Sequence, residues 1–320
     1  MMFTFLFLIL LLKLNFDIEN SMGFEYDSNI FKLSSKEIQE FKTGLYPEKY
    51  PYNTLDDLKI NSRTTFNLKS AAGCRWAFTV SIKQIINNPQ KDFSAFSSSF
   101  FTSRNRVSLN IRASYHPPLL IRHYKPLNST FYIPCKISRK QVSFKIGYKY
   151  KNAFLSTEAR FWLDDYNKEF SYYDSRNLLF LLNFSTKPTR NTSTSLEYNF
   201  TTSKADGRNP DISYVQHGAN FEFTIYPGKF RIQKTKLHYN FDYRKYVSDN
   251  PPQLDFLHAG RNEIYQDVGF EIQGRLWYGL YSILKVEKEW RQTYSKVYPD
   301  IYKLKNYRRL LAELRFIFRI

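Results

Sequence analysis

The chain of 320 residues has only two cysteines and one long apolar run, and these shortages exclude several classes of protein. Two cysteines cannot form a disulfide-dense scaffold or a zinc module of paired Cys-x-x-Cys motifs, although a single Cys74–Cys135 disulfide stays possible. Because the apolar run is confined to the start and the mean hydropathy is −0.50, a bundle of transmembrane helices is excluded. The motifs GxxxxGKS/T, HExxH and GxSxG are absent, so we predict no catalytic residue, no cofactor and no metal site.

Aromatic residues and positive charge, by contrast, are plentiful. Phenylalanine, tyrosine and tryptophan make up 18% of the chain, which argues against disorder along its whole length. Lysine and arginine number 47 against 29 acidic residues, a net charge of +18. These basic residues are dispersed, and no nucleic-acid recognition motif accompanies them, so we predict no nucleic-acid partner. Anionic lipid head groups and small anionic solutes remain as partners for the excess charge.

The amino terminus is typical of a secretory signal peptide. Residues Met1–Leu12 read MMFTFLFLILLL, far short of the ~20 residues that span a bilayer as a helix but as long as a signal-peptide core. No lysine or arginine precedes this core and no clean small-x-small cleavage site follows it, so a buried strand or helix end is the alternative. We predict a signal peptide over 1–22, cleaved between Asn15 and Gly23.

Residues 23–73 differ in sequence pattern from the rest of the chain. The segment KLSSKEIQEFKTGL predicts a short helix capped by Ser35, and YPEKYPYNTLDDLK predicts an extended connector punctuated by proline. Because 23–73 holds too few apolar residues for a core of its own, we expect a short N-terminal extension rather than a separate domain.

From residue 74 to residue 320 apolar and polar side chains alternate with period two, which is the pattern of β-strands. The segment QVSFKIGYKY at 141–150, for example, alternates throughout its length. Turn-forming clusters such as TKPTRNTS and TSKADGRNPD separate such segments, which gives roughly 12–14 strands of about ten residues each. Transmembrane strands need about 9–11 residues, whereas strands of globular proteins usually have about 5–6.

A closed transmembrane barrel explains both faces of these strands. The polar face carries arginine, lysine, glutamate and aspartate together, which a dry core could not accommodate. Many long strands without helices to cover them must close or expose an edge, and closure with the apolar face toward lipid satisfies both faces. Aromatic residues near the strand ends are typical of an interfacial girdle. We therefore predict an all-β fold, a closed antiparallel transmembrane β-barrel over 74–320.

The last ten residues, LAELRFIFRI, carry an aromatic or aliphatic side chain at every second position to the end. In this the chain resembles bacterial outer-membrane β-barrel proteins, and the segments around Arg261, Tyr307 and Arg308 resemble the end of uncharacterised large barrels. The resemblance implies a bacterial outer-membrane location, contact with outer-membrane lipid, and a terminal strand that the barrel-assembly machinery reads. Isoleucine ends the chain where the family usually has phenylalanine, and the implied assembly signal comprises Leu314, Phe316, Phe318 and Ile320.

We predict a barrel without enzymatic activity that acts as a passive pore or a surface platform. Basic residues that interleave with the apolar positions would face the lumen and concentrate anions there, so weak anion selectivity is expected. Pairing with a lumen carboxylate is the alternative role for each of these side chains. The set comprises Arg106, Arg112, Lys145, Lys149, Arg160, Arg244, Arg275, Arg315 and Arg319.

Two other classes of function stay open. A barrel-embedded lipid-modifying enzyme would need a polar cluster on the outer wall, but His217 is followed two residues later by Ala219 rather than by a serine. A soluble secreted all-β binding protein would use exposed tyrosine and tryptophan to hold its partners. Such a protein would stay monodisperse in buffer without detergent, whereas a membrane barrel would not.

The terminal strand yields a first prediction. Deleting residues 316–320 should abolish membrane insertion, because the barrel could neither close nor present its terminal signal. Heat-modifiable migration on a gel and insolubility in sarkosyl measure insertion of the closed barrel. A truncated chain that still inserts and still shifts on heating would contradict the prediction.

Overall fold

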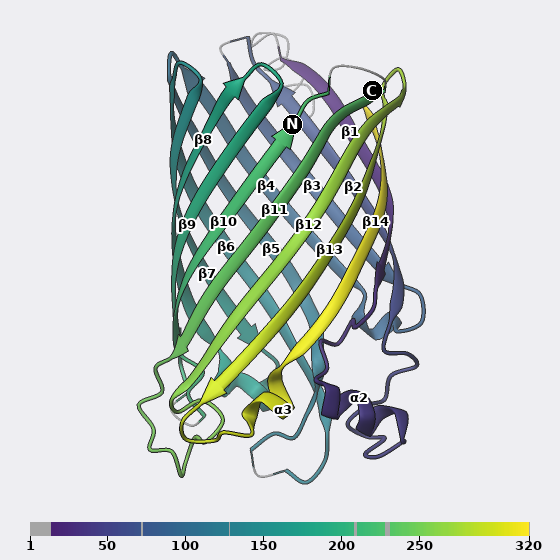
Figure 1. Ribbon diagram of the computed structural model, residues 1–320, viewed down its shortest axis with the longest axis vertical. Coiled ribbons are helices and arrows are strands. Elements are labelled where there is room, and N and C mark those ends of the chain that lie inside the picture. Colours follow the sequence, from purple (N-terminus) through teal and green to yellow (C-terminus); the bar gives the residue numbers. More distant parts are fainter. Residues whose placement is uncertain (1–13, 72, 128, 208–209, 228–230, 320) are drawn as a thin grey trace, which may run out of the picture.

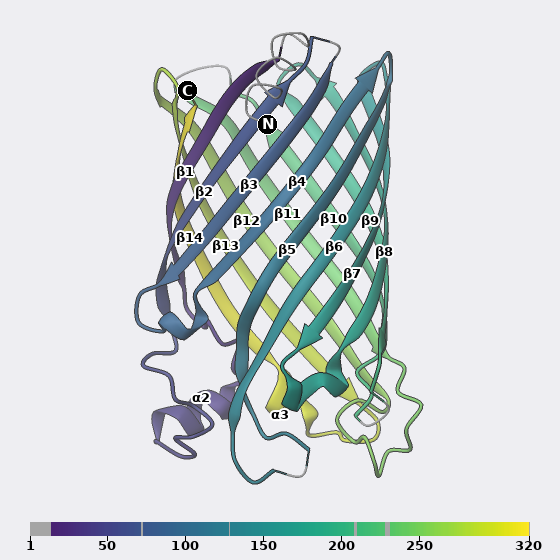
Figure 2. The same ribbon diagram turned by 180° about the vertical axis from the view of Figure 1, so that it is seen from behind.

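A computed structural model describes residues 14–71, 73–127, 129–207, 210–227 and 231–319. Within these residues fourteen antiparallel strands form one closed barrel (Figures 1 and 2). The predicted fold class is therefore confirmed. Each strand pairs with its neighbours in sequence, and β1 pairs with β14 to close the ring. No helix of the described residues is long and apolar enough to cross a membrane.

The strands of the barrel are mostly longer than the strands of globular proteins, as the alternation predicted. Their bounds are β1 Asn15–Asp27, β2 Asp57–Lys69, β3 Cys74–Ile85, β4 Phe93–Arg104, β5 Val107–Tyr124, β6 Ile133–Tyr150, β7 Ala153–Tyr166, β8 Ser175–Thr189, β9 Thr192–Ala205, β10 Tyr214–Ile225, β11 Ile232–Tyr246, β12 Arg261–Trp277, β13 Leu280–Ser295 and β14 Tyr307–Arg319. The helices are α2 Ser35–Lys42 and α3 Ile301–Lys305, with 3-10 turns η1 Pro89–Lys91 and η2 Lys168–Tyr173.

The structure corrects the predicted N-terminal extension over 23–73. The last five residues of β1 and all of β2 come from this segment, and both strands belong to the barrel wall. Their outward faces are interrupted by polar side chains, Asn20 in β1 and Ser62 and Thr64 in β2, which hides the period-two pattern in the sequence. A barrel strand also needs no core of its own, because it shares the wall with its neighbours. The apolar run Met1–Leu12 lies outside the described residues, and the predicted signal peptide stays a prediction. Its predicted end at residue 22 overlaps β1, because residues 15–22 belong to this strand and Glu19–Met22 pair with β14.

Two sets of side chains alternate on the wall. One set is apolar and solvent-exposed in the isolated chain, as in the row formed by Phe24, Leu314 and Leu284 on three neighbouring strands. The other set is polar and includes Glu25, Glu313 and Lys285, which occupy the next row of the same strands. The first face suits contact with lipid tails, and the second suits an aqueous lumen.

The two ends of the barrel differ in the length of their connections. Short turns join the strands at the end where β1 begins and β14 ends, while the other end carries α2, α3, η1 and η2 (Figure 1). Asn105 and Lys151 take positive φ angles in two of the short hairpin turns, as tight turns between twisted strands require. Outer-membrane barrels have short periplasmic turns and longer extracellular loops, so the helical end is the extracellular end.

The connection between β1 and β2, residues 28–56 and here called L1, has a small core of its own. Phe31 stacks on Tyr52 with ring centroids 3.5 Å apart, and Phe31 is only 2% exposed. Helix α2 starts within L1, where the Ser34 hydroxyl accepts from the Glu37 amide and the Glu37 carboxylate accepts from the Ser34 amide. The helix cap is therefore Ser34, and the predicted cap at Ser35 is wrong by one residue.

The two cysteines lie at opposite ends of the barrel. Cys74 begins β3 at the short-turn end, while Cys135 lies near the start of β6 at the extracellular end, and both are free thiols. A disulfide between them would need the chain to refold, because bonded cysteines have Cα atoms only about 4.4–6.8 Å apart.

The placement of β1 in the lipid-facing wall can be tested by introducing one charged side chain on its outward face. Met22 faces outward near the middle of β1, opposite Phe316, so Met22→Arg should destabilise the inserted barrel by about 2–4 kcal/mol. The control is Ser21→Arg, since Ser21 lies on the polar face of the same strand and should tolerate a cation. The measurement is the urea midpoint of unfolding in lipid vesicles. Equal midpoints for the two variants would contradict the placement of β1.

Candidate functional site

The nine predicted lumen residues fall into two groups. Five lie on the polar face within strands: Arg112, Lys145, Arg160, Arg244 and Arg315. Arg160 and Arg315 have carboxylate partners, Glu158 and Glu313, at 2.7 and 2.6 Å. Arg244 donates to the amide oxygen of Gln216 at 2.9 Å and lies 3.9 Å from the Glu263 carboxylate. Arg112 donates to Ser97 at 3.3 Å, and Lys145 is the register partner of Glu158.

The other four lie at the short-turn end. Arg106 is a turn residue, with its guanidinium 5.8 Å from the Tyr150 ring, and Arg275 sits at a bulge near Tyr278. The tight turn after β4 consists of residues 105 and 106, and β5 begins at Val107. Arg106 therefore lies in the turn and not in the strand. Arg319 is the last residue of β14, and its side chain lies outside the described part. Lys149 lines a cavity of about 530 Å³ whose other basic residues are Lys151, Lys187, Lys234 and Lys236.

The predicted assembly signal occupies the outward face of β14. Leu314, Phe316 and Phe318 alternate there with Glu313 and Arg315, while Ile320 lies outside the described residues. Reading of this strand by the assembly machinery stays a prediction.

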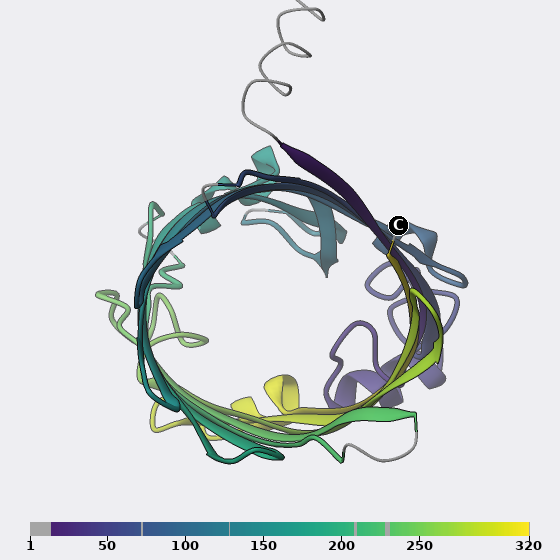
Figure 3. The same ribbon diagram turned by 90° about the horizontal axis from the view of Figure 1, so that it is seen from above.

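At the extracellular end L1 crosses the lumen between two walls of the barrel. Lys32 of L1 reaches Glu289 of β13 at 2.9 Å. On the other wall, Arg122 of β5 donates to the carbonyls of Phe31 and Lys32 and to the Glu37 carboxylate, the last at 3.2 Å. Strands β14, β1, β2, β3 and β4 separate β13 from β5 around the ring, so L1 joins two strands that are far apart in the wall. Figure 3, which looks along the barrel, shows L1 and α3 projecting inside the ring.

This crossing leaves a cavity of about 230 Å³ that is lined mainly by basic side chains. The lining comes from L1, β5, β13 and the connections that hold η1 and α3. We call its five basic residues the mouth cluster: Lys32, Lys91, Arg122, Arg291 and Lys305. Ile30, Phe31, Ile121 and Tyr124 complete the lining.

Acidic partners neutralise only part of the mouth cluster. Glu289, Glu37 and Glu263 lie beside Lys32, Arg122 and Arg291 respectively. Glu263 is fully buried and also contacts Arg244 and Arg261, so three guanidinium groups share one carboxylate. This sharing leaves a surplus of positive charge at the mouth.

Lys91 and Lys305 have no such partner among the residues that the structure describes. The Lys91 ammonium donates to the carbonyl of Ile121 at 2.8 Å and lies 5.1 Å from the Phe31 ring. Burial, and then repulsion from Arg122 and Lys32, lower the pKa of Lys91 to about 7. Burial, and then repulsion from Arg261 and Arg291, likewise lower the pKa of Lys305 to about 7. An anion in the cavity would relieve this repulsion and favour the charged form of both lysines.

None of the mouth cluster was among the nine residues predicted from the sequence. Lys32, Lys91 and Lys305 lie in connections between strands, where period-two alternation carries no information about direction. Arg122 and Arg291 do lie in strands, but the proline-interrupted segment before Arg122 hides the alternation there. Contacts across the lumen depend on how L1 folds, and spacing along the chain does not reveal them.

The outer wall carries the histidine considered for lipid chemistry. His217 Nδ1 lies 2.7 Å from the Tyr198 hydroxyl, and the ring packs 5.2 Å from the Phe200 ring. The hydroxyl beside His217 thus belongs to a tyrosine and not to a serine. A tyrosine on the outer wall is typical of an interfacial girdle, whereas a nucleophile activated by histidine would be a serine.

Comparisons with known proteins agree with this architecture. No family model matches the chain, and no curated protein matches its sequence. Among solved structures, the outer membrane channel DcaP of Acinetobacter baumannii is similar with a TM-score of 0.53 and 9% identity, over 96% of this chain and 97% of that one. The loop L8 deletion mutant of OmpT, an outer membrane protein of Vibrio cholerae, gives 0.52 and 7% over 96% and 99%.

At such identities the likeness concerns the fold. The chain thus has the architecture of bacterial outer-membrane β-barrel proteins, as the resemblance of its terminal strand implied. The predicted outer-membrane location is consistent with this architecture and with the apolar outer face of the wall.

The crossing of the lumen by L1 depends on Arg122. Arg122→Met removes its bonds to L1 and leaves the Glu37 carboxylate, only 8% exposed, without its cation. Breaking a buried pair in this way costs about 3–5 kcal/mol, so L1 should be released from the wall. The measurement is the rate at which protease added outside intact vesicles cleaves L1, which should rise.

The matched control is Arg104→Met, which removes an arginine at the short-turn end of β4. The double variant Arg122→Met with Glu37→Gln should recover part of the resistance, because no charge is then left unpaired. Unchanged cleavage in Arg122→Met would show that L1 is held in place by its core alone.

Proposed function

We propose that this protein is a passive pore of the bacterial outer membrane that prefers small anions. The observation that carries the proposal is the mouth cluster, five basic side chains around one cavity inside the barrel. The lysine-lined cavity at the short-turn end supports it from the other side of the membrane, because five of its lining residues are lysines and one is a glutamate. A solute would therefore meet positive charge on entering and on leaving.

The electrostatic bias should be weak in ordinary salt. Several basic side chains along the wall have carboxylate partners, for example Arg160 with Glu158 at 2.7 Å and Arg315 with Glu313 at 2.6 Å. In the cavity at the short-turn end, Lys236 pairs with Glu222 at 3.2 Å and Lys234 with Glu271 at 3.0 Å. The remaining field is screened within about 10 Å at 0.1 M salt. Low ionic strength should make the preference for anions larger.

A surface platform is the second candidate, and the crossing of the lumen by L1 favours it. A loop fixed to two distant strands of the wall narrows the opening and presents an ordered surface outside the cell. In that case the mouth cluster would hold an anionic partner at the surface instead of a permeating solute. Conductance separates the two functions.

The proposed pore should prefer anions, and more strongly at low pH. Lys91 and Lys305, each with a pKa of about 7, are mostly protonated at pH 6 and mostly neutral at pH 8.5. The positive charge of the mouth is therefore larger at pH 6. In a planar bilayer under a gradient of dilute potassium chloride, the reversal potential should indicate anion selectivity that weakens as the pH rises from 6 to 8.5.

The double variant Lys91→Met, Lys305→Met should weaken the anion selectivity and flatten its dependence on pH. Lys140→Met is the control, because Lys140 pairs with Asp165 at 2.9 Å on the exposed outer wall. Cation selectivity, or an undiminished pH dependence in the double variant, would refute the role of the mouth cluster. A correctly folded barrel without conductance would refute the pore itself.

A further inference from the structure

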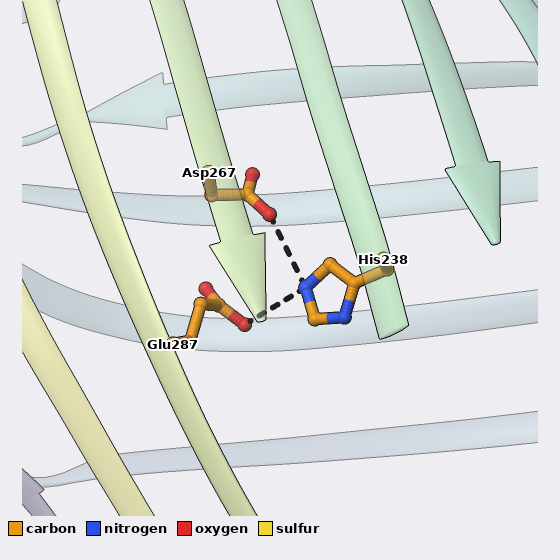
Figure 4. A group of neighbouring side chains, drawn as sticks. All are labelled: His238, Asp267 and Glu287. Atoms are coloured by element: carbon orange, nitrogen blue, oxygen red, sulfur yellow. Dashed lines mark ion pairs between the residues drawn. The ribbon is translucent and has the colours of Figure 1, made fainter. Parts of the chain in front are cut away.

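Three potential metal ligands meet on the polar face of β11, β12 and β13. His238 Nε2 lies 3.3 Å from Asp267 Oδ1 and 3.5 Å from Glu287 Oε2, and all three ligand atoms lie within 4.8 Å of one another (Figure 4). Each residue comes from a different strand, so the wall of the barrel sets their spacing. The group is distinct from the mouth cluster and shares no residue with it.

A glycine makes room for the imidazole. His238 pairs in register with Gly269 of β12, and Gly269 pairs with Glu287 of β13, so Gly269 lies between the two ligands. A Cβ atom at Gly269 would stand 2.2 Å from Cε1 and 2.6 Å from Nε2 of His238. The ring therefore lies flat across the place where a side chain would be. Glycine is unfavourable inside a strand, and its presence often marks such a close approach.

We propose that His238, Asp267 and Glu287 bind a divalent transition-metal ion such as Zn²⁺ on the wall of the lumen. Metal–ligand bonds of about 2.0–2.2 Å place tetrahedral ligand atoms about 3.3–3.6 Å apart, and two of the three spacings here have these values. One imidazole and two carboxylates suit Zn²⁺ and its first-row neighbours better than Ca²⁺ or Mg²⁺, which prefer oxygen ligands alone. The remaining coordination positions would face the lumen and take water or a solute.

Neighbouring side chains supply an outer shell to the carboxylates. Asn240 donates to Asp267 Oδ1 at 2.7 Å, and Lys285 forms an ion pair with Glu287. Hydrogen bonds of this kind orient ligating carboxylates in metal sites. The Lys285 ammonium also competes with a metal for Glu287, so removing it should strengthen metal binding. This opposite effect distinguishes a metal site from a plain ion pair between His238 and its two carboxylates.

The test uses the full chain without a histidine tag, refolded in detergent, and Zn²⁺ or Co²⁺ as the probe. Calorimetric titration should show saturable binding of one Zn²⁺ per chain. His238→Ala, Asp267→Asn and Glu287→Gln should each weaken binding by at least about 10-fold. Lys285→Met should tighten it. With Co²⁺, the visible absorption bands of the bound ion should appear in the unmodified chain and be lost in His238→Ala.

The controls separate ligation from folding and from chance binding. His217→Ala removes a histidine on the outer wall and should leave the affinity unchanged. Gly269→Ala keeps all three ligands but displaces the His238 ring, and should weaken binding. Heat-modifiable migration on a gel shows that each variant is a closed barrel. Absence of saturable binding to the unmodified chain, or equal binding by His238→Ala, would overturn the proposal.

Discussion

The structure depends on one constraint: inside a bilayer every backbone N–H and C=O must find a partner within the protein. Fourteen strands meet this condition only because β1 pairs with β14, from Glu19 opposite Arg319 to Asp27 opposite Leu311. Once the ring is closed, each strand has one face toward lipid and one toward the lumen. The division into apolar and polar rows, and hence the charged interior, follows from this closure.

Inside the ring, charge is arranged in two ways. Along the wall, acidic and basic side chains on neighbouring strands pair with each other, which limits the cost of keeping them together in a narrow space. At the extracellular mouth, connections bring three lysines beside Arg122 of β5 and Arg291 of β13. Two of these lysines, Lys91 and Lys305, have no carboxylate partner among the described residues. The surplus of positive charge thus arises at the end of the lumen, where the strand pattern stops.

Period-two alternation was sufficient to predict the class of fold and the face on which many strand residues lie. It failed for β1 and β2, because Asn20, Ser62 and Thr64 interrupt their lipid-facing rows. It also could not reveal the mouth cluster, whose members meet only after L1 has folded across the lumen, nor the group at His238, whose ligands come from three strands. Alternation reports the direction of a side chain from its own strand, whereas a site also depends on the register between strands and on the loops.

The position of L1 links the closing of the wall to the narrowing of the lumen. L1 joins β1 to β2, and β1 is the strand that completes the ring, so one hairpin carries both the seam and the segment that crosses the mouth. A chain that has not yet brought β1 to β14 also holds L1 away from at least one of its two anchoring walls. Docking of L1 on both of its partners therefore requires the closed wall, so the narrow mouth forms no earlier than the ring itself.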